Sequence, residues 1–192
     1  MQRTVRTFVA IEISPEVRSR AKKLIDLLQT IDAKVRWVDP AQLHLTLKFL
    51  GEIDLLEVPK VCAAVESVAA AFPPFSIRVA SAGAFPDLKR PRTVWLGVDD
   101  ETEELAALHA QLEEALAKLG FRAENRRFRP HLTIGRVRGE GAGISELSRV
   151  IEEQRDYPVG VIDVDAVIVF SSEQERGGPV YEPLGTAMLE GR

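Results

Sequence analysis

A short string of residues that occurs twice constrains this chain more than any other feature. Histidine, leucine, threonine and an aliphatic residue follow one another at positions 44–47 and again at positions 131–134. The chain contains only three histidines, and two of them stand in this context. By ordinary residue frequencies a given histidine meets the pattern about once in a thousand cases, so chance does not account for two occurrences. We therefore expect a pseudo-symmetric site to which each half of the chain contributes one histidine and one threonine.

Both strings alternate as a β-strand with one buried face would. In the first strand, one face carries the apolar side chains and the other the polar ones (Leu43, Leu45, Leu47 and Phe49 against His44, Thr46 and Lys48). In the second strand the division is the same (Pro130, Leu132 and Ile134 against His131 and Thr133). The alternation predicts that the histidine and the threonine of each motif are neighbours on one face.

Two imidazoles and two hydroxyls suit phosphoryl chemistry at neutral pH. A neutral histidine can take a proton from an attacking water, and a protonated histidine can give one to the leaving oxygen. Threonine hydroxyls can donate hydrogen bonds to an anionic phosphate without repelling it. Because water can be the nucleophile, no nucleophilic side chain is needed. Alternation and spacing leave open which histidine is the acid and which is the base.

Positive charge gathers around the second motif only. Between Arg122 and Arg138 there are six arginines and a single acid, Glu124. Such a run is either a solvated surface or a source of positive potential at a phosphate site. Arg129 lies two residues before His131 and would share its face if the strand already runs there, so it is a candidate phosphate contact. The arginines of the run occupy positions 122, 126, 127, 129, 136 and 138.

The histidines do not predict a metal centre. Two histidines without a nearby cluster of carboxylates or cysteines make a poor zinc site, and we expect no metal and no cofactor. His109 has neither the motif nor a partner, so we expect a structural residue on the surface or edge of a helix. Cys62, the only cysteine, excludes an internal disulfide and suits a reducing cytosol. The sequence contains neither the phosphate-binding loop GxxxxGK[ST] nor the nucleophile elbow GxSxG.

Composition narrows the class of protein further. A chain of 192 residues with 45% hydrophobic residues can bury a core. Its net charge is −4, whereas a protein that binds long nucleic acid non-specifically usually has an overall positive charge. No apolar stretch reaches the length of about 18 residues that a membrane span requires, and residues 1–8 lack the apolar core of a signal peptide. We expect a cytoplasmic protein.

Helices and paired strands are mixed along the chain without strict β-α-β alternation, which predicts an α+β fold. Asp100 is expected to cap the third helix, with Glu103 closing a capping box. We expect helices at about 15–31, 59–71, 100–119 and 144–153, and strands at both motifs and near 5–13, 35–38, 75–80, 93–98, 160–170 and 180–188.

The segments that carry the two motifs resemble a known family. They are similar to the 2H phosphoesterase superfamily, and most similar to its branch of RNA 2′,3′-cyclic phosphodiesterases, once described as 2′-5′ RNA ligases. The resemblance runs across nearly the whole chain, and all four motif positions agree. The matching residues are Trp37, Leu43–Glu52 and Phe128–Arg136, supported by Arg6–Ile11, Gly83–Pro86 and Trp95–Val98.

The resemblance implies a bilobal α+β fold formed by a single domain, residues 1–192. Each of the two pseudo-symmetric lobes would consist of an antiparallel sheet flanked by helices, and the chain would cross between the lobes. The active-site cleft would lie between the two sheets and contain both motifs.

The implied reaction is hydrolysis of a terminal RNA 2′,3′-cyclic phosphate to a 2′-phosphate, with water as the nucleophile and without a metal. By resemblance, His44 would be the proton donor to the leaving 3′-oxygen, and His131 would be the proton acceptor that activates water. Thr46 and Thr133 would bind the non-bridging phosphate oxygens.

The expected substrates are RNA ends with a cyclic phosphate, or nucleoside 2′,3′-cyclic phosphates. The net charge favours a protein that holds an RNA end rather than a long strand, and the loop 85–92 is a candidate rim for that RNA. We expect a monomer that binds no membrane. Two alternatives stay open: the same histidines could join RNA ends reversibly through 2′-5′ linkages, or the protein could recognise RNA ends without turning them over.

Overall fold

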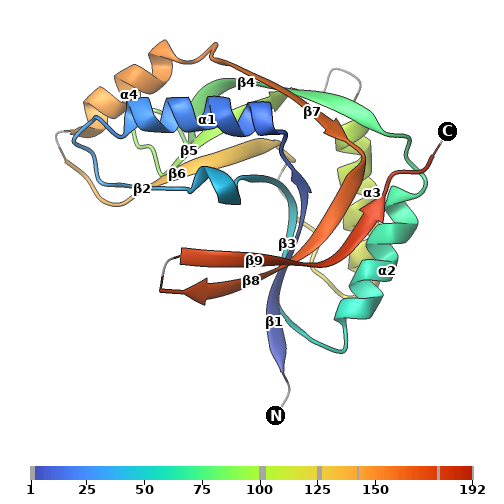
Figure 1. The fold of residues 1–192 in the computed structure, drawn as a ribbon. Coiled ribbons are helices and arrows are strands. Elements are labelled where there is room, and N and C mark those ends of the chain that lie inside the picture. The colour runs from blue at the N-terminus through green and yellow to red at the C-terminus, as the bar shows by residue number, and fades with distance from the viewer. Residues whose placement is uncertain (1–2, 100–102, 125–126, 142, 177, 192) are drawn as a thin grey trace.

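The fold combines helices with two β-sheets, as Figure 1 shows. The computed structural model describes residues 3–99, 103–124, 127–141, 143–176 and 178–191. Its elements are β1 (Thr4–Glu12), α1 (Pro15–Leu28), β2 (Val35–Trp37), the 3-10 helix η1 (Pro40–Gln42), β3 (His44–Asp54), α2 (Val58–Ala69), β4 (Phe75–Phe85), β5 (Thr93–Asp99), α3 (Glu104–Lys118), β6 (His131–Val137), α4 (Gly143–Glu153), β7 (Pro158–Val164), β8 (Ala166–Glu175) and β9 (Gly178–Met188).

Two antiparallel sheets define two lobes. One sheet has four strands in the order β3-β1-β8-β9, and the other has five in the order β2-β6-β5-β4-β7. Helices α2 and α3 pack together beside the four-stranded sheet, and α1 and α4 pack on the five-stranded sheet (Figure 1). The chain passes from one sheet to the other several times, because β1 and β3 belong to one sheet and β2 between them belongs to the other. The predicted bilobal α+β fold is confirmed.

One apolar core runs through both lobes. It joins the stripe of α1 that contains Leu24 and Leu28, the stripe of α3 that contains Leu108 and Leu112, and the inner faces of both sheets. A second, smaller cluster of Phe8, Ala10, Ile168 and Phe170 lies on the opposite face of the four-stranded sheet, since these side chains alternate along β1 and β8 with core residues. This second cluster gives that face an apolar floor.

The segment 160–170, which the sequence predicted as one strand, is two strands in different sheets. β7 pairs with β4, and β8 pairs with β1. The chain changes lobes at Asp165, whose carbonyl accepts a hydrogen bond from the Leu189 backbone amide at 2.8 Å. The prediction was wrong because residues 161–170 contain no glycine or proline to mark the break, so only the pairing partners reveal it.

The helix ends agree with the sequence in one case and differ in another. Ser14 caps α1 as the sequence pattern indicates, accepting a hydrogen bond from the Val17 amide at 3.3 Å. The predicted capping box of α3 is wrong. Glu103 itself is the N-cap, in a left-handed conformation (φ 61°) and without a side-chain cap, while Asp100 lies outside the described residues.

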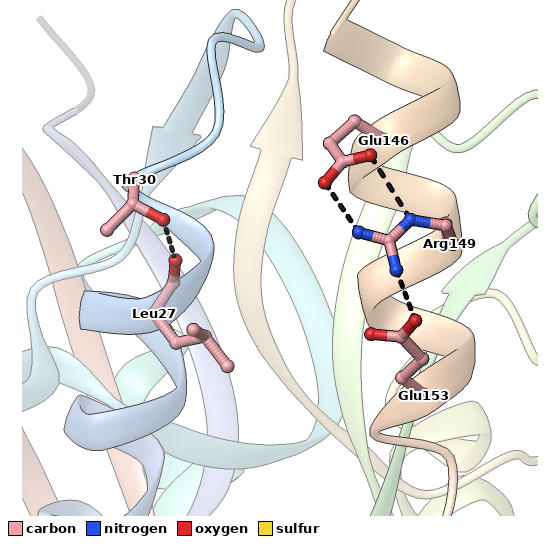
Figure 2. A network of polar contacts seen from close by, with 5 residues as sticks. All are labelled: Leu27, Thr30, Glu146, Arg149 and Glu153. Atoms are coloured by element: carbon pink, nitrogen blue, oxygen red, sulfur yellow. Dashed lines mark hydrogen bonds and ion pairs between the residues drawn. The ribbon is translucent and has the colours of Figure 1, made fainter.

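The outer surface of α4 carries ion pairs, which Figure 2 shows beside the end of α1. Arg149 contacts Glu146 at 2.6 Å and also Glu153. Exposed pairs of this kind stabilise a fold by at most about 1 kcal/mol. The buried Leu147 and Ile151 on the opposite face therefore anchor the helix.

Two glycines make room for tryptophan rings near the second motif. A Cβ on Gly135 of β6 would come within 2.7 Å of the Trp37 ring, and a Cβ on Gly83 of β4 would overlap the Trp95 ring. These close approaches explain why glycine and tryptophan recur among the residues that carry the family resemblance.

No helix in the described parts of the chain is long and apolar enough to cross a membrane.

Candidate active site

A cleft of about 1380 Å³ between the two sheets brings the two motifs together. His44 and Thr46 reach it from β3, and His131 and Thr133 reach it from β6. The two motifs are 87 positions apart in the chain. They meet because β3 belongs to one sheet, β6 belongs to the other, and the cleft lies between the two sheets. Arg129 lines the same cleft.

Both motif strands carry a β-bulge three residues after the histidine. In the β1–β3 pair, Val9 is opposite Lys48 and Ala10 is opposite Thr46, which leaves Leu47 as the extra residue. In the β5–β6 pair the register shifts in the same way, and Ile134 is the extra residue. An extra residue reverses the inward and outward alternation of the strand beyond it.

The bulges turn the fifth residue after each histidine toward the cleft. Phe49 on β3 is 56% exposed, and Arg136 on β6 is also exposed; both line the cleft. Lys48 is turned inward and is only 2% exposed. The predicted faces of β3 were therefore wrong beyond Leu47: Lys48 does not share the face of His44. Arg136 belongs to the arginine run that the sequence analysis identified, whereas the only signal of Phe49 in the sequence was its spacing of five from His44.

Each histidine is oriented by a backbone carbonyl two residues earlier. The Nδ1 atom of His44 lies 2.8 Å from the carbonyl oxygen of Gln42, and the Nδ1 atom of His131 lies 2.7 Å from that of Arg129. A carbonyl only accepts, so Nδ1 carries the hydrogen in both rings. Nε2 is then the atom that can take or give a proton in each imidazole.

His44 sits against aromatic rings of the apolar floor. Its ring centroid is 4.8 Å from that of Phe8 and 5.1 Å from that of Tyr181, which meets it edge-on. Burial among these rings lowers the pKa of His44, and the hydrogen bond to the Gln42 carbonyl acts in the opposite direction.

His131 has a more positive environment. Its ring meets Phe85 edge-on at 4.9 Å, and the guanidinium of Arg129 lies over the same Phe85 ring at 4.8 Å. Burial lowers the pKa of His131, the hydrogen bond to the Arg129 carbonyl raises it, and the charges of Arg136 and Arg129 lower it further. The asymmetry of charge between the motifs that the sequence showed thus acts on the second histidine.

Arginine dominates the charge of the cleft. Of the predicted run from Arg122 to Arg138, Arg122 does not line the cleft, and Arg126 lies outside the described residues. In the loop 85–92 only Phe85, Pro86 and Arg92 reach the cleft. The sequence did not single out Arg6 or Arg36. The arginines of the lining are Arg6, Arg36, Arg92, Arg127, Arg129, Arg136 and Arg138, against the acids Asp39 and Glu124.

A buried ion pair joins the first motif strand to the segment that precedes the second. The Nζ atom of Lys48 lies 2.7 Å from a carboxylate oxygen of Glu113 on α3 and donates to the Arg122 carbonyl at 2.8 Å. Glu113 in turn accepts from the Glu124 amide at 3.0 Å. Helix α3 thereby holds the arginine-rich segment next to β3.

His109 takes part in the same contact and is buried, not on the helix surface as predicted. Its ring stacks on Phe128 with 3.8 Å between centroids, so the arginine-rich segment covers it. Burial lowers the pKa of His109, while the charges of Glu113 and Glu124 raise it. Within the described ranges, no group of three or more histidine, cysteine and acidic residues is arranged to hold a metal.

Known proteins resemble this chain over almost its entire length. A family model described as the 2′-5′ RNA ligase superfamily matches residues 28–176. A protein of Methanothermobacter thermautotrophicus named RNA 2′,3′-cyclic phosphodiesterase is 35% identical, over 92% of this chain and 95% of its own. A protein of the same name from Thermotoga maritima is 34% identical, over 97% of each chain. The crystal structure of E. coli LigT complexed with 3′-AMP superposes with a TM-score of 0.79 at 26% identity, covering 97% of this chain and 99% of that one.

The matched region contains both His-x-Thr motifs and the two strands that bring them to the cleft. Sequence, fold and cleft therefore agree, and they show that this chain belongs to the 2′-5′ RNA ligase superfamily of 2H phosphoesterases and is a hydrolase.

Proposed function

We propose that this protein hydrolyses the 2′,3′-cyclic phosphate at the end of an RNA to a 2′-phosphate, with residues 1–192 acting as one domain. The observation that carries this proposal is the pair of histidines in one cleft, each with Nδ1 fixed by a backbone carbonyl and Nε2 left for proton transfer. Relatives named RNA 2′,3′-cyclic phosphodiesterase support it. The four motif side chains supply an acid, a base and two hydroxyl donors, so the reaction needs no metal.

His131 is the proposed base. The positive charges of Arg136 and Arg129 oppose its protonation, which favours the neutral imidazole that accepts a proton from water. His44 is the proposed acid for the leaving 3′-oxygen. Among the described residues, no arginine charge is a cause of the shift in its pKa, and an anionic cyclic phosphate bound beside it would favour its protonated form.

Thr46, Thr133 and Arg129 are the proposed phosphate-binding residues. Each lines the cleft with the histidines. The hydroxyls donate to the non-bridging oxygens, and the guanidinium adds positive charge where negative charge develops in the transition state.

The test is incubation of the protein with an RNA that ends in a 2′,3′-cyclic phosphate, with and without EDTA, followed by mass analysis of the product. We expect a 2′-phosphate in both samples. Replacing His44 or His131 with Ala should lower kcat by about 100-fold or more. Full activity of either variant would contradict the two-histidine mechanism, and loss of activity in EDTA would contradict the metal-free reaction.

The same experiment separates the two alternatives. Products joined end to end, formed when a 5′-hydroxyl RNA is added, would support 2′-5′ ligation. Binding of the RNA end without any product would support a recognition module. Thr46→Ala and Thr133→Ala should each lower kcat/KM by removing a proposed phosphate contact. Thr30→Ala is their matched control and should leave kcat/KM unchanged, because the Thr30 hydroxyl donates to the Leu27 carbonyl outside the cleft (Figure 2).

A further inference from the structure

We propose that the cleft contains a second phosphate subsite, formed by Arg6, Arg36 and Arg136 around the hydroxyl of Tyr181. Its ligand is the phosphate on the 5′ side of the terminal nucleotide, so the preferred substrate is an RNA strand rather than a nucleoside cyclic phosphate. The inference rests on the proposed function, since it names the part of the substrate next to the cyclic phosphate.

Two of the arginines face each other across neighbouring strands. Arg36 on β2 is directly opposite Arg136 on β6, and both side chains are exposed and line the cleft. Directly opposed like charges on paired strands destabilise a sheet. An anion bound between the two guanidinium groups would remove that repulsion.

The third arginine comes from the other sheet. Arg6 lies on β1, is exposed and lines the same cleft. Glu52 is its partner residue on β3, but the ion pairs found within the described ranges do not include Arg6, Arg36 or Arg136. Three guanidinium groups from two sheets thus line one cleft, and in the described parts of the chain none of them is held in an ion pair.

Tyr181 lines the same cleft as the three arginines. Burial raises the pKa of its phenol, and the charges of Arg136, Arg6 and Arg36 act in the opposite direction. With its raised pKa the phenol stays protonated at neutral pH and can donate a hydrogen bond to a phosphate oxygen.

The subsite adjoins the catalytic residues. The ring of Tyr181 meets the ring of His44 edge-on at 5.1 Å, and the charge of Arg136 also acts on His131. A phosphate held there would therefore be a close neighbour of the cyclic phosphate.

The chemistry of an RNA end identifies the ligand. When the cyclic phosphate occupies the 2′ and 3′ oxygens of the last nucleotide, the next anion of the strand is the phosphate on the 5′ oxygen of that nucleotide. Arginine is suited to it, because the planar guanidinium donates two parallel hydrogen bonds to a phosphate. A nucleoside 2′,3′-cyclic phosphate has no such group and would leave the subsite empty.

The experiment compares kcat/KM for three substrates: cytidine 2′,3′-cyclic phosphate, the same nucleotide with a 5′-phosphate, and the dinucleotide CpC with a terminal cyclic phosphate. We expect the protein to prefer the second and third over the first by about tenfold or more, mainly through KM. Arg6→Gln and Arg36→Gln should each reduce this preference by about tenfold. Comparing kcat/KM for the second and third substrates shows whether the subsite prefers a terminal phosphate monoester or a phosphodiester.

Arg155→Gln is the matched control, because it removes the same charge from an exposed arginine on the surface outside the cleft. It should retain the preference. Equal kcat/KM of the unmodified protein for all three substrates would overturn the subsite, and so would an equal loss on all three in the Arg6 and Arg36 variants.

Failure of the proposed function would look different, because no cyclic phosphate would then be hydrolysed. In that case the affinity for cytidine 2′-phosphate is compared with that for cytidine 2′,5′-bisphosphate by calorimetry. Tighter binding of the bisphosphate, lost in Arg36→Gln, would support the subsite. Equal affinity for the two compounds would overturn it.

Discussion

At the scale of single residues, the two histidines are equal in orientation and unequal in environment. Both give Nδ1–H to the carbonyl two residues before them. His44 is surrounded by aromatic rings, whereas His131 is also close to Arg129 and Arg136. Charge, rather than geometry, is therefore the physical basis on which the two can take different roles.

Replacing Arg129 with Gln tests this basis. The variant keeps the backbone carbonyl that orients His131 but removes a charge that lowers the pKa of His131. That pKa should rise, so the acidic limb of the profile of kcat/KM against pH should move to higher pH. The rate itself should fall by about tenfold if the proposed phosphate contact of Arg129 is lost.

The pH profile of Arg138→Gln provides the control for this prediction. Arg138 also lines the cleft, yet its charge is not among the causes of the shift at His131. An acidic limb that stays in place in Arg129→Gln would show that Arg129 does not act on His131, the proposed base.

At the scale of elements, two features shape the cleft: the bulges of β3 and β6, and the contact of α3 with both motif segments. The bulges point Phe49 and Arg136 into the cleft and turn Lys48 into the interior. Lys48 then pairs with Glu113, which holds the segment before His131. A change at the inward-facing Lys48 should therefore affect both stability and the second motif.

Lys48→Met should lower the free energy of unfolding by about 3 kcal/mol, because it leaves the largely buried carboxylate of Glu113 without its cation. Urea denaturation measures the difference. Lys60→Met removes a lysine whose pair with Glu57 is exposed and should cost less than about 1 kcal/mol.

The double variant Lys48→Met with Glu113→Leu adds a further check. It should recover much of the loss, since two apolar side chains replace the whole pair. A loss in Lys48→Met no larger than that in Lys60→Met would contradict the structural importance of the buried pair.

At the scale of the whole molecule, all three histidines are packed at or near the contact between the lobes. Burial is the largest cause of the lowered pKa of His44, His109 and His131. The unfolded chain, with histidine pKa values of about 6.5, binds more protons than the folded protein just below that pH. Stability is therefore full above about pH 6.5 and decreases as the pH falls toward the lowered pKa values.

We predict that the free energy of unfolding decreases between about pH 7 and pH 5. His109→Gln should make this decrease shallower, because one of the three contributing imidazoles is removed. Urea denaturation at several pH values gives the slope. A slope unchanged by His109→Gln would mean that the burial of His109 does not perturb its proton affinity.

Much of the fold, and the meeting of the two motifs in one cleft, could be predicted from the sequence. Residue patterns of local range indicated the helices, the Ser14 cap and the alternation that pairs each histidine with its threonine. The errors have one cause in common. The strand break at Asp165, the reversed face of Lys48 and the burial of His109 all depend on which distant segment lies opposite, and no local pattern records that.

The sequence by itself determined the candidate side chains of this protein: two His-x-Thr motifs, each on a strand with an apolar back, and arginines around the second. Only the tertiary structure decided which other residues join them. Bulges defined by strand register turned Phe49 and Arg136 into the cleft, and the crossing of the chain between two sheets brought Arg6 and Arg36 there. The physical reason is that alternation is a property of one strand, whereas register and the meeting of two sheets are properties of pairs of segments far apart in the chain.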